Sequence, residues 1–421
     1  MPKSGPLIIC SNHTNAFMDA LIFGSHIPRP MKSLPRGNIF FTSGPVLRWL
    51  FNEVGMIPIF RAMEGKENLH RNEETFKRCF EVMGDGGVIH VFPEGICVPE
   101  RRIKAMKKGP ARIILGAEER HDFSLNTKIV FAGMNYEKAW RFKTNLFLNF
   151  SRVYSVDEFV ELYKENTVKG INELTKSLKP ALTNQVIHLD KAEYDNFYEQ
   201  IESLYADKLR AEYKLSERNL EHRFLVSREI ARGINYHFVE NTEEITALQQ
   251  QSAEYFQELE SLKLSDKVLF NLPDTTQFWL RIAGMVLGFP IHLYGLVNNY
   301  LPAKIAKTVA DKVVKKIDFY SSVTTVVGLC AFLFFYPFMV NLFWLWTNSI
   351  ALTVLYASTL YLSGNYAAFY IEDLRKLKSE YVHFQFKRNN LTKFNALLLK
   401  RKNIVSKLMV LKEAYRSRHC K

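Results

Sequence analysis

The chain has 421 residues, of which 47% are apolar and 13% aromatic, so it is long enough for two or three domains and is not a disordered protein. Its formal net charge is +13, which suggests an anionic partner such as nucleic acid, a membrane surface or an acidic substrate. Residues 372–421 hold fourteen Lys or Arg and four Asp or Glu, so most of the excess lies in the last part of the chain. This placement disfavours nucleic-acid binding, which needs basic residues distributed over one domain.

The five cysteines are dispersed along the chain, and none has the spacing of metal ligands. An odd, scattered set predicts a reducing compartment, and neither a metal nor another cofactor is expected. Residues 7–10 are too short for the apolar region of a signal peptide, so the NHT sequon at Asn12 is not expected to be glycosylated.

Residues 1–190 are predicted to form an α/β domain in which helices cover both faces of a mixed sheet. The β-rich runs are residues 6–10, 55–60, 87–92, 127–136 and 144–150. Helical stretches lie between them, at residues 68–83 and 105–119.

Residues 191–276 are predicted to be helical, because the stretch Lys191–Leu264 is rich in helix formers, with one Gly and no Pro. Apolar residues recur there at helical spacing, as at Leu220, Phe224 and Ile230. We expect a helical hairpin or a small bundle. Its role is open: it could dock on a membrane, dimerise, or cover a substrate tunnel.

Residues 277–371 have the composition of a membrane region. Residues 323–346 and 350–371 are apolar runs, and each is long enough to cross a hydrocarbon layer of about 30 Å. The short link between them predicts a tight hairpin. Residues 282–300 contain Pro290 and several glycines, so we expect them to be re-entrant or interfacial; three ordinary spans are the alternative.

Basic residues flank the predicted hairpin on both sides. Residues 301–319 carry five lysines, and residues 372–421 form a strongly basic tail. Because Lys and Arg mark cytoplasmic loops, we expect a multi-pass membrane protein with its tail and its N-terminal domain on the cytoplasmic side. Three spans would instead place the N-terminal domain outside.

The stretch LIICSNHTNAFMDAL, residues 7–21, reads as a strand, a polar turn and a helix, which is where α/β proteins place chemistry. His13 follows the strand and Asp19 lies at the start of the helix. A short turn can bring the carboxylate to the imidazole, fix its tautomer and leave the other nitrogen free as a base. There is no Gly-x-Ser-x-Gly elbow and no suitable Cys nucleophile, so direct attack by a substrate hydroxyl fits better than a covalent intermediate. The alternative is a capping or core histidine.

Two further motifs carry candidate substrate contacts. In GMIPIFRAME, which begins at Gly55, an apolar strand ends in Arg61, whose forked cation suits a phosphate, although arginines at strand ends are common. In VIHVFPEG a buried strand ends in a sharp turn that fixes Glu94, which could accept hydrogen bonds from a polyol or order a neighbouring base. The basic residues that follow could bind phosphate or form a solvated face: Arg101, Arg102, Lys104, Lys107 and Lys108.

Over roughly residues 1–150 the chain resembles the glycerolipid acyltransferase family. The resemblance rests on four motifs in this order: Asn-His…Asp, Gly…Arg, Phe-Pro-Glu-Gly and a strand with Gly-x-Asn-Tyr. The resemblance implies that His13 is the general base that deprotonates the acceptor hydroxyl, and that Asp19 orients it. It also implies a set of substrate-binding residues: Asn12, Gly55, Arg61, Phe92, Pro93, Glu94, Gly95, Lys107 and Lys108. Acyl-CoA or acyl-carrier protein would be a co-substrate.

The chain departs from the family pattern in the spacing of the first motif. The family usually has four residues between the histidine and the aspartate, whereas five stand here, Thr14 to Met18. With Asn15 two residues after His13, this longer form is similar to fungal-type glycerol-3-phosphate and dihydroxyacetone-phosphate acyltransferases and their bacterial relatives. That branch also carries membrane segments after the catalytic domain. Family members usually have helical sequence before the first strand, whereas here only six residues precede it.

The sequence therefore predicts a membrane-bound acyltransferase of phospholipid biosynthesis. It would transfer a fatty acyl group from a thioester to glycerol 3-phosphate, dihydroxyacetone phosphate or 1-acylglycerol 3-phosphate, with membrane lipids as further partners. One alternative is an enzyme specific for 1-acylglycerol 3-phosphate. Another is an inactive lipid-binding scaffold, in which the fifth intervening residue uncouples His13 from Asp19. The acceptor, the acyl donor, the chain length and the oligomeric state stay open.

Overall fold

The computed structural model describes residues 1–37, 40, 44–53, 55–60, 72–141, 143–271 and 273–419. Contacts within it divide the chain into two compact units. The first unit holds residues 1–188 together with a short segment, residues 317–322, and the second holds residues 189–316 and 323–421. The short segment therefore belongs to the N-terminal unit although it is distant in sequence.

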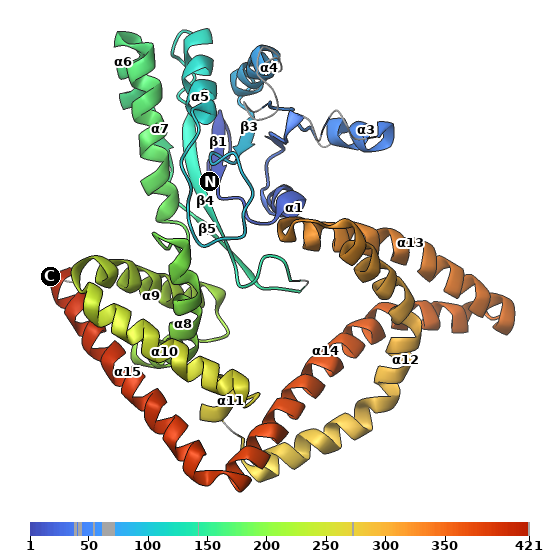
Figure 1. The fold of residues 1–421 in the computed structure, drawn as a ribbon. Coiled ribbons are helices and arrows are strands. Elements are labelled where there is room, and N and C mark those ends of the chain that lie inside the picture. Colours follow the sequence, from blue (N-terminus) through green and yellow to red (C-terminus); the bar gives the residue numbers. More distant parts are fainter. Residues whose placement is uncertain are drawn as a thin grey trace. The chain divides into compact units, whose positions relative to one another are not determined.

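The first unit is built around a six-stranded mixed sheet (Figure 1). Its strands are β1 (Leu7–Ser11), β2 (Met31–Ser33), β3 (Val88–Val91), β4 (Lys128–Tyr136), β5 (Leu146–Phe150) and β6 (Tyr154–Ser155). Strands β2, β3, β1 and β4 are parallel neighbours in that order, and β5 and β6 pair with β4 in antiparallel fashion. The expected mixed sheet is confirmed, with β1 between β3 and β4 and buried along its whole length.

Helices cover both faces of this sheet, as the sequence predicted. Successive residues of β1 point to opposite faces, and each face has its own core. Ile8 and Cys10 belong to a core with α4 (Asn72–Gly84), α5 (Gly109–Arg120) and α7 (Thr167–Thr183). Leu7 and Ile9 belong to the other core, which contains Phe23 of α1 (Ala16–His26).

One element prediction in this unit is wrong, and a second element begins later than expected. Residues 55–60, which follow α3 (Pro45–Glu53), were expected to form a strand, but among the described residues they make only an isolated bridge between Ile59 and Arg36. The helix expected from residue 105 begins at Gly109. The preceding residues belong to the loop after β3, since the Lys107 N–H donates to the Pro93 carbonyl at 2.8 Å. Helix α6 (Asp157–Glu165) completes this unit before α7.

The second unit is helical. After the short η3 (Ala192–Tyr194), helices α8 (Asp195–Glu212), α9 (Leu220–Glu240) and α10 (Thr242–Ser261) pack on one another and on α15 (Leu391–His419). Helix α11 (Asp266–Phe270) joins this bundle through a buried ion pair, in which the Arg401 Nε donates to the Asp266 carboxylate at 2.9 Å. The described part of the expected basic tail, residues 372–419, thus forms the end of α14 (Ile350–Asn389) and α15, which packs within this bundle.

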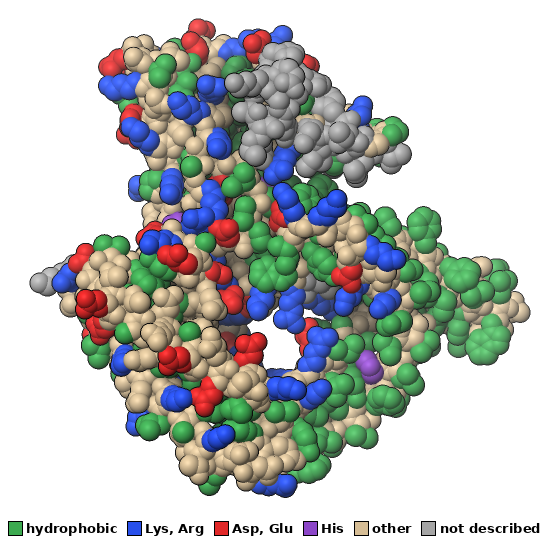
Figure 2. All heavy atoms as spheres, in the orientation of Figure 1, with side chains coloured by type: hydrophobic (Ala, Val, Ile, Leu, Met, Phe, Trp, Pro, Cys, Tyr) green, Lys and Arg blue, Asp and Glu red, His purple; other side chains and the backbone are tan. Residues whose placement is uncertain are grey.

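Long apolar helices form the rest of the second unit. Two stretches of the described chain are long and apolar enough to cross a membrane, by length and composition. The first is α12 (Thr275–Val313). The second is Ile317–Thr347, which contains η4 (Ile317–Phe319) and α13 (Tyr320–Thr347). Many of their large apolar side chains are exposed, such as Phe334 (79%) and Trp346 (80%), and Figure 2 shows hydrophobic side chains gathered over these helices.

The structure bears on two of the expected membrane segments. Helix α12 continues through Pro290, so residues 282–300 lie within one long helix, and their expected re-entrant or interfacial placement stays a prediction. Helix α14, expected to hold the second span at residues 350–371, is not one of the two candidate spans in the described part of the chain. Polar residues such as Ser363 and Asn365 lower the mean hydropathy of α14.

Candidate active site

The polar turns that follow three neighbouring strands lie at one edge of the sheet. Because β1, β3 and β4 run parallel, their carboxyl ends meet at this edge. His13 follows β1, Phe92 and Glu94 follow β3, and Tyr136 is the last residue of β4. The fold therefore gathers residues that are more than a hundred positions apart in the sequence.

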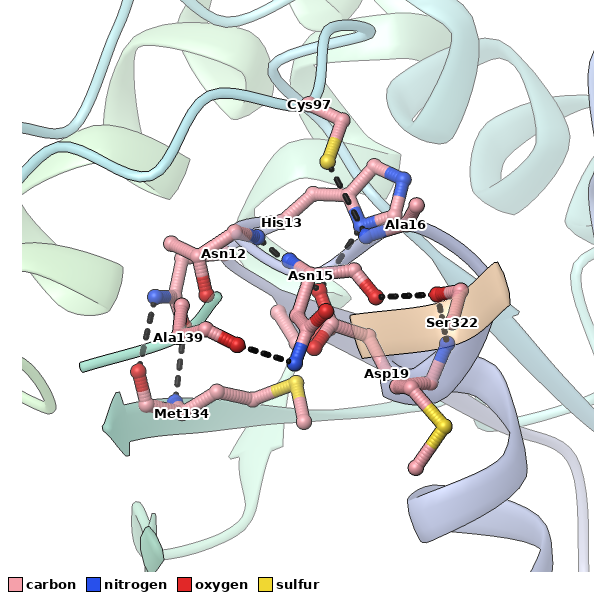
Figure 3. A network of polar contacts seen from close by, with 12 residues as sticks. Asn12, His13, Asn15, Ala16, Asp19, Cys97, Met134, Ala139 and Ser322 are labelled. Carbon is pink, nitrogen blue, oxygen red and sulfur yellow. Dashed lines mark hydrogen bonds and ion pairs between the residues drawn. The ribbon is translucent and has the colours of Figure 1, made fainter. Parts of the chain in front are cut away.

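His13 and Asp19 are in direct contact, as the sequence predicted (Figure 3). The Nδ1 atom of His13 lies 2.9 Å from Oδ2 of Asp19. The carboxylate is fully buried, whereas the His13 side chain is 14% exposed. Within the described part of the chain, no hydrogen-bond partner contacts the His13 Nε2 atom. This arrangement holds the imidazole by one nitrogen and leaves the other for a substrate.

The Asp19 carboxylate is held by further donors, as a buried charge requires. The backbone N–H groups of Thr14 and Asn15 each donate to Oδ2 at 2.9 Å. The Tyr136 hydroxyl donates to Oδ1 at 2.7 Å. Burial, and then the neighbouring Asp19 charge, raise the pKa of Tyr136 well above its usual range, so its hydroxyl stays protonated and remains a donor.

The turn before α1 accommodates the one residue by which the spacing of His13 and Asp19 exceeds the usual four. Thr14 and Asn15 lie in this turn, and the helix begins at Ala16, which has a φ of +36°. Left-handed backbone at a non-glycine residue costs about 1–3 kcal/mol, so the surrounding contacts must stabilise it. The Ala16 N–H donates to the Cys97 Sγ atom at 3.1 Å, which is one such contact.

Phe92 and His90 lie beside the His13 ring. The ring of Phe92 stacks on that of His13, with centroids 3.8 Å apart. His90, in β3, is fully buried, lies edge-on to Phe92, and is 2.7 Å from the Ser11 hydroxyl through its Nε2 atom. Burial, with a smaller contribution from His13, lowers the pKa of His90 to about 3, so this ring is neutral near pH 7.

Glu94 links the loop after β3 to the turn that carries His13. Its side chain is 5% exposed, and it accepts hydrogen bonds from the backbone N–H groups of Lys104, at 2.8 Å, and of His13. Burial raises the pKa of Glu94 from its usual value, and the two N–H donors oppose that rise. Gly95 has a φ of +69°, which explains a glycine in the turn after Pro93.

Lys107 and Lys108 are exposed at the start of α5, where Lys108 is the N-cap residue. Their ammonium groups add to the partial positive charge of unpaired N–H groups at a helix N-terminus. Lys104, by contrast, pairs with Glu100. Arg102 also pairs with Glu100, at 3.3 Å. Lys107 and Lys108 are therefore better placed than these two residues to meet an anionic substrate.

The remaining predicted residues have different places. Both ends of the Asn12 amide bond to the backbone of Met134 in β4, at 3.0 and 2.7 Å, so this side chain fastens the end of β1. Gly55 has a φ of +71° and closes α3, since its N–H donates to the Asn52 carbonyl. Binding of substrate by these two residues stays a prediction. Arg61 lies outside the described residues.

The sequence analysis did not assign a role to several residues of this network. Tyr136 stands in the Gly-x-Asn-Tyr motif, and its place at the end of a strand next to β1 is a signal that could have marked it. His90 could have been noticed as a histidine in a fully apolar strand. Asn15 and Ser321 contact each other, but no pattern in the sequence connects residues so far apart.

Comparisons with known proteins concern the N-terminal part of the chain, which carries this site. Residues 1–130 match the family model described as Acyltransferase. Glycerol-3-phosphate O-acyltransferase 2 of Saccharomyces cerevisiae is 27% identical over 112 residues, which are 26% of this chain and 15% of the yeast protein. The chloroplastic 1-acyl-sn-glycerol-3-phosphate acyltransferase of Arabidopsis thaliana is 28% identical over 110 residues, 26% of this chain and 28% of the plant protein.

The N-terminal part of the chain is therefore similar to acyltransferase domains. The two relatives support the glycerolipid acyltransferase family within that class, as the sequence motifs indicated. The matched region spans less than a third of the length of either relative.

Proposed function

We propose that this chain transfers a fatty acyl group from an acyl thioester to a hydroxyl of a glycerol phosphate. The observation that carries the proposal is the contact between His13 Nδ1 and Asp19 after the carboxyl end of β1, with no partner on the His13 Nε2 atom among the described residues. The family match of residues 1–130 supports the reaction class. The inactive-scaffold alternative required these two side chains to be out of hydrogen-bond reach, and they are 2.9 Å apart.

In the proposed reaction His13 is the general base. Its Nε2 takes the proton of the acceptor hydroxyl while the hydroxyl oxygen attacks the thioester carbonyl carbon and forms the new C–O bond. The tetrahedral intermediate collapses by breaking the C–S bond, and the leaving thiolate takes the proton back from the imidazolium. Asp19 keeps the ring oriented and stabilises its transient positive charge. The reaction needs no covalent bond between the enzyme and the acyl group, and it needs no metal.

Basic groups near the catalytic turn would hold the acceptor phosphate. Lys107 and Lys108 are exposed at the N-terminus of α5, directly after the loop that contains Glu94 and Gly95. An anion there would meet two ammonium groups and the positive end of a helix. Arg61, in the second motif, is the further candidate.

The acceptor is glycerol 3-phosphate, dihydroxyacetone phosphate or 1-acylglycerol 3-phosphate in this proposal. The yeast relative is named for the first of these and the Arabidopsis relative for the third. A strict preference for 1-acylglycerol 3-phosphate, which would yield phosphatidic acid, is the second candidate. Acyl-CoA and acyl-carrier protein are the two possible donors.

We also propose that the chain is an integral membrane protein with its catalytic domain on the cytoplasmic side. The two apolar helices and their exposed side chains support membrane association, because large exposed apolar surfaces need a lipid or protein partner. The lysines of residues 301–319 and the basic residues 372–421 support the sidedness. Each well-placed basic residue would add about 1 kcal/mol of attraction to an anionic leaflet.

The test is acyl transfer by membranes that contain the wild-type chain, His13→Ala or the control His26→Ala. His26 is an exposed histidine at the end of α1. Each acceptor is offered with acyl-CoA and with acyl-carrier protein. We expect His13→Ala to lower the rate by about 10²–10⁴-fold, as loss of a general base does, and His26→Ala to leave it unchanged. Activity that survives His13→Ala would refute the mechanism, and the preferred acceptor would decide between the two candidates.

A further inference from the structure

The short segment at residues 317–322 contacts the catalytic turn, although about three hundred residues separate them in the sequence. It comprises η4 and the first residues of α13, and it belongs to the same unit as the acyltransferase sheet. Three of its polar side chains are buried, those of Asp318, Ser321 and Ser322. Buried polar groups need partners, and all three find them in or beside the turn that carries His13.

Two of these contacts reach Asn15. The Ser321 hydroxyl donates to the Asn15 Oδ1 atom, and the Ser322 hydroxyl lies 3.5 Å from the Asn15 carbonyl oxygen. The Ser322 hydroxyl also accepts from the backbone N–H of Met18, in the first turn of α1, at 3.3 Å (Figure 3). The third contact joins the Asp318 carboxylate to the Cys97 thiol.

Both ends of the Asn15 side-chain amide form hydrogen bonds. Its Nδ2 atom donates to the Ala139 carbonyl, in the chain just after β4, at 2.8 Å, while its Oδ1 atom accepts from Ser321. Its own backbone N–H is one of the donors that hold the Asp19 carboxylate. Asn15 is 3% exposed, so water does not replace these bonds readily. A movement of the Asn15 side chain would therefore move a donor of the catalytic carboxylate.

Asn15 lies at the strained end of the turn. Asn15 is the last residue before α1 and precedes Ala16, whose φ of +36° marks the strained point of the turn. Contacts on both sides of a strained residue are what keeps such a conformation populated. Residues 317–322 supply part of these contacts.

We propose that Asn15 and Ser321 are positioning residues, which together hold the turn between His13 and Asp19 in the geometry that the proposed acyl transfer needs. The inference rests on the proposed function for its effect on catalysis. It means that the segment leading into the apolar helix α13 sets the geometry of the catalytic pair, and that the acyltransferase domain depends on a piece of chain that follows α12.

The proposal is tested by a double-mutant cycle of Asn15→Ala and Ser321→Ala in the full-length chain in membranes. Neither side chain contacts the substrate in this proposal, so KM should change less than twofold in either single variant. Ser321→Ala loses one hydrogen bond to Asn15 and should lower kcat by about tenfold, whereas Asn15→Ala loses two and should lower it at least as much. Because the two residues act through one contact, the double variant should be no slower than the slower single variant. The matched control is Ser25→Ala, which removes an exposed hydroxyl from α1.

A second readout does not depend on acyl transfer. Burial raises the pKa of the Cys97 thiol, which accepts the Ala16 N–H, so alkylation of Cys97 should be slow in the wild type. Loosening of the turn should accelerate it by about fivefold or more in both single variants and not in Ser25→Ala. The alkylated peptides are quantified by mass spectrometry. Cys10 and Cys79 are fully buried, so only variants in which both stay unlabelled count as folded.

The outcomes separate this inference from the proposed function. Lower kcat, faster Cys97 alkylation and a non-additive double variant support the inference. Unchanged kcat in Ser321→Ala, effects that multiply in the double variant, or an unchanged Cys97 rate would overturn it. If the wild-type chain transfers no acyl group to any glycerol phosphate, the proposed function fails, and the same cycle measured on Cys97 alkylation alone decides whether Asn15 and Ser321 hold the turn.

Discussion

Replacing Tyr136 by Phe removes one hydroxyl that donates to the Asp19 carboxylate and leaves the aromatic ring in place. That hydroxyl is 2.7 Å from Oδ1 of Asp19, while the other donors to this carboxylate bond to Oδ2. The variant would therefore leave one oxygen of a fully buried carboxylate without a partner among the described residues. A hydrogen bond to a charged group contributes about 1.5–3 kcal/mol. If this is lost in the transition state, the rate falls by about ten- to a hundredfold.

We expect this loss in kcat rather than in KM, because Asp19 contacts His13 and not the substrate. The assay is initial-rate acyl transfer in membranes at saturating donor, with the acceptor varied. Tyr163→Phe is the matched control, since the Tyr163 hydroxyl also donates to a carboxylate, that of Glu119, at 2.8 Å and on the α5–α6 side of the sheet. A Tyr136→Phe variant within twofold of the wild type, or an equal loss in Tyr163→Phe, would refute the assignment of Tyr136 to Asp19.

Three other predictions concern stability, measured by thermal unfolding in detergent. Gly133→Ala in β4 places a Cβ against the Gln185 carbonyl and should destabilise the protein by about 1–3 kcal/mol. The control Gly233→Ala has open space around it in α9 and should be neutral or stabilising. Equal effects of the two variants would contradict the close approach at Gly133. The pKa of His90 is lowered to about 3, so as the pH falls below about 6.5 only the unfolded chain gains this proton, and about 1.4 kcal/mol of stability is lost for each pH unit. His90→Gln should remove that part of the pH dependence, and parallel curves for variant and wild type would count against a buried neutral ring. Arg401→Met leaves the buried Asp266 carboxylate without its cation and should destabilise the protein by about 3–5 kcal/mol. The control Lys400→Met breaks an exposed pair with Glu258 and should lower stability by less than about 1 kcal/mol. Similar values for the two variants would show that α15 is not anchored through Arg401.

The sequence was most informative where chemistry and local pattern coincide. His13 and Asp19 lie six residues apart at a junction between a strand and a helix, so their contact could be predicted from local geometry alone. The parallel strands that precede His13 and Glu94 could be predicted in the same way, because each is an apolar run that ends in a polar turn.

Tertiary contacts were not predictable from such patterns. The run 55–60 has the composition of a strand, but it makes a single bridge, and the sheet edge is instead formed by the three residues of β2, which are too few to show a period. Tyr136 and Ser321 reach the catalytic turn only because the fold brings distant segments together. Lys107, read as part of a helix, is held outside it by a backbone hydrogen bond to Pro93.

The inclusion of residues 317–322 in the first unit has a consequence for the order in which the protein is made. More than a hundred residues, including the apolar helix α12, are translated between His188 and this segment. At about 5–20 residues per second the acyltransferase unit therefore waits on the order of ten seconds for its last piece. By then α12 has already left the ribosome. A fragment that ends at residue 188 would keep the contact of Asn15 with Ala139 but lack those with Ser321 and Ser322, so the first unit is completed only together with the apolar part of the chain.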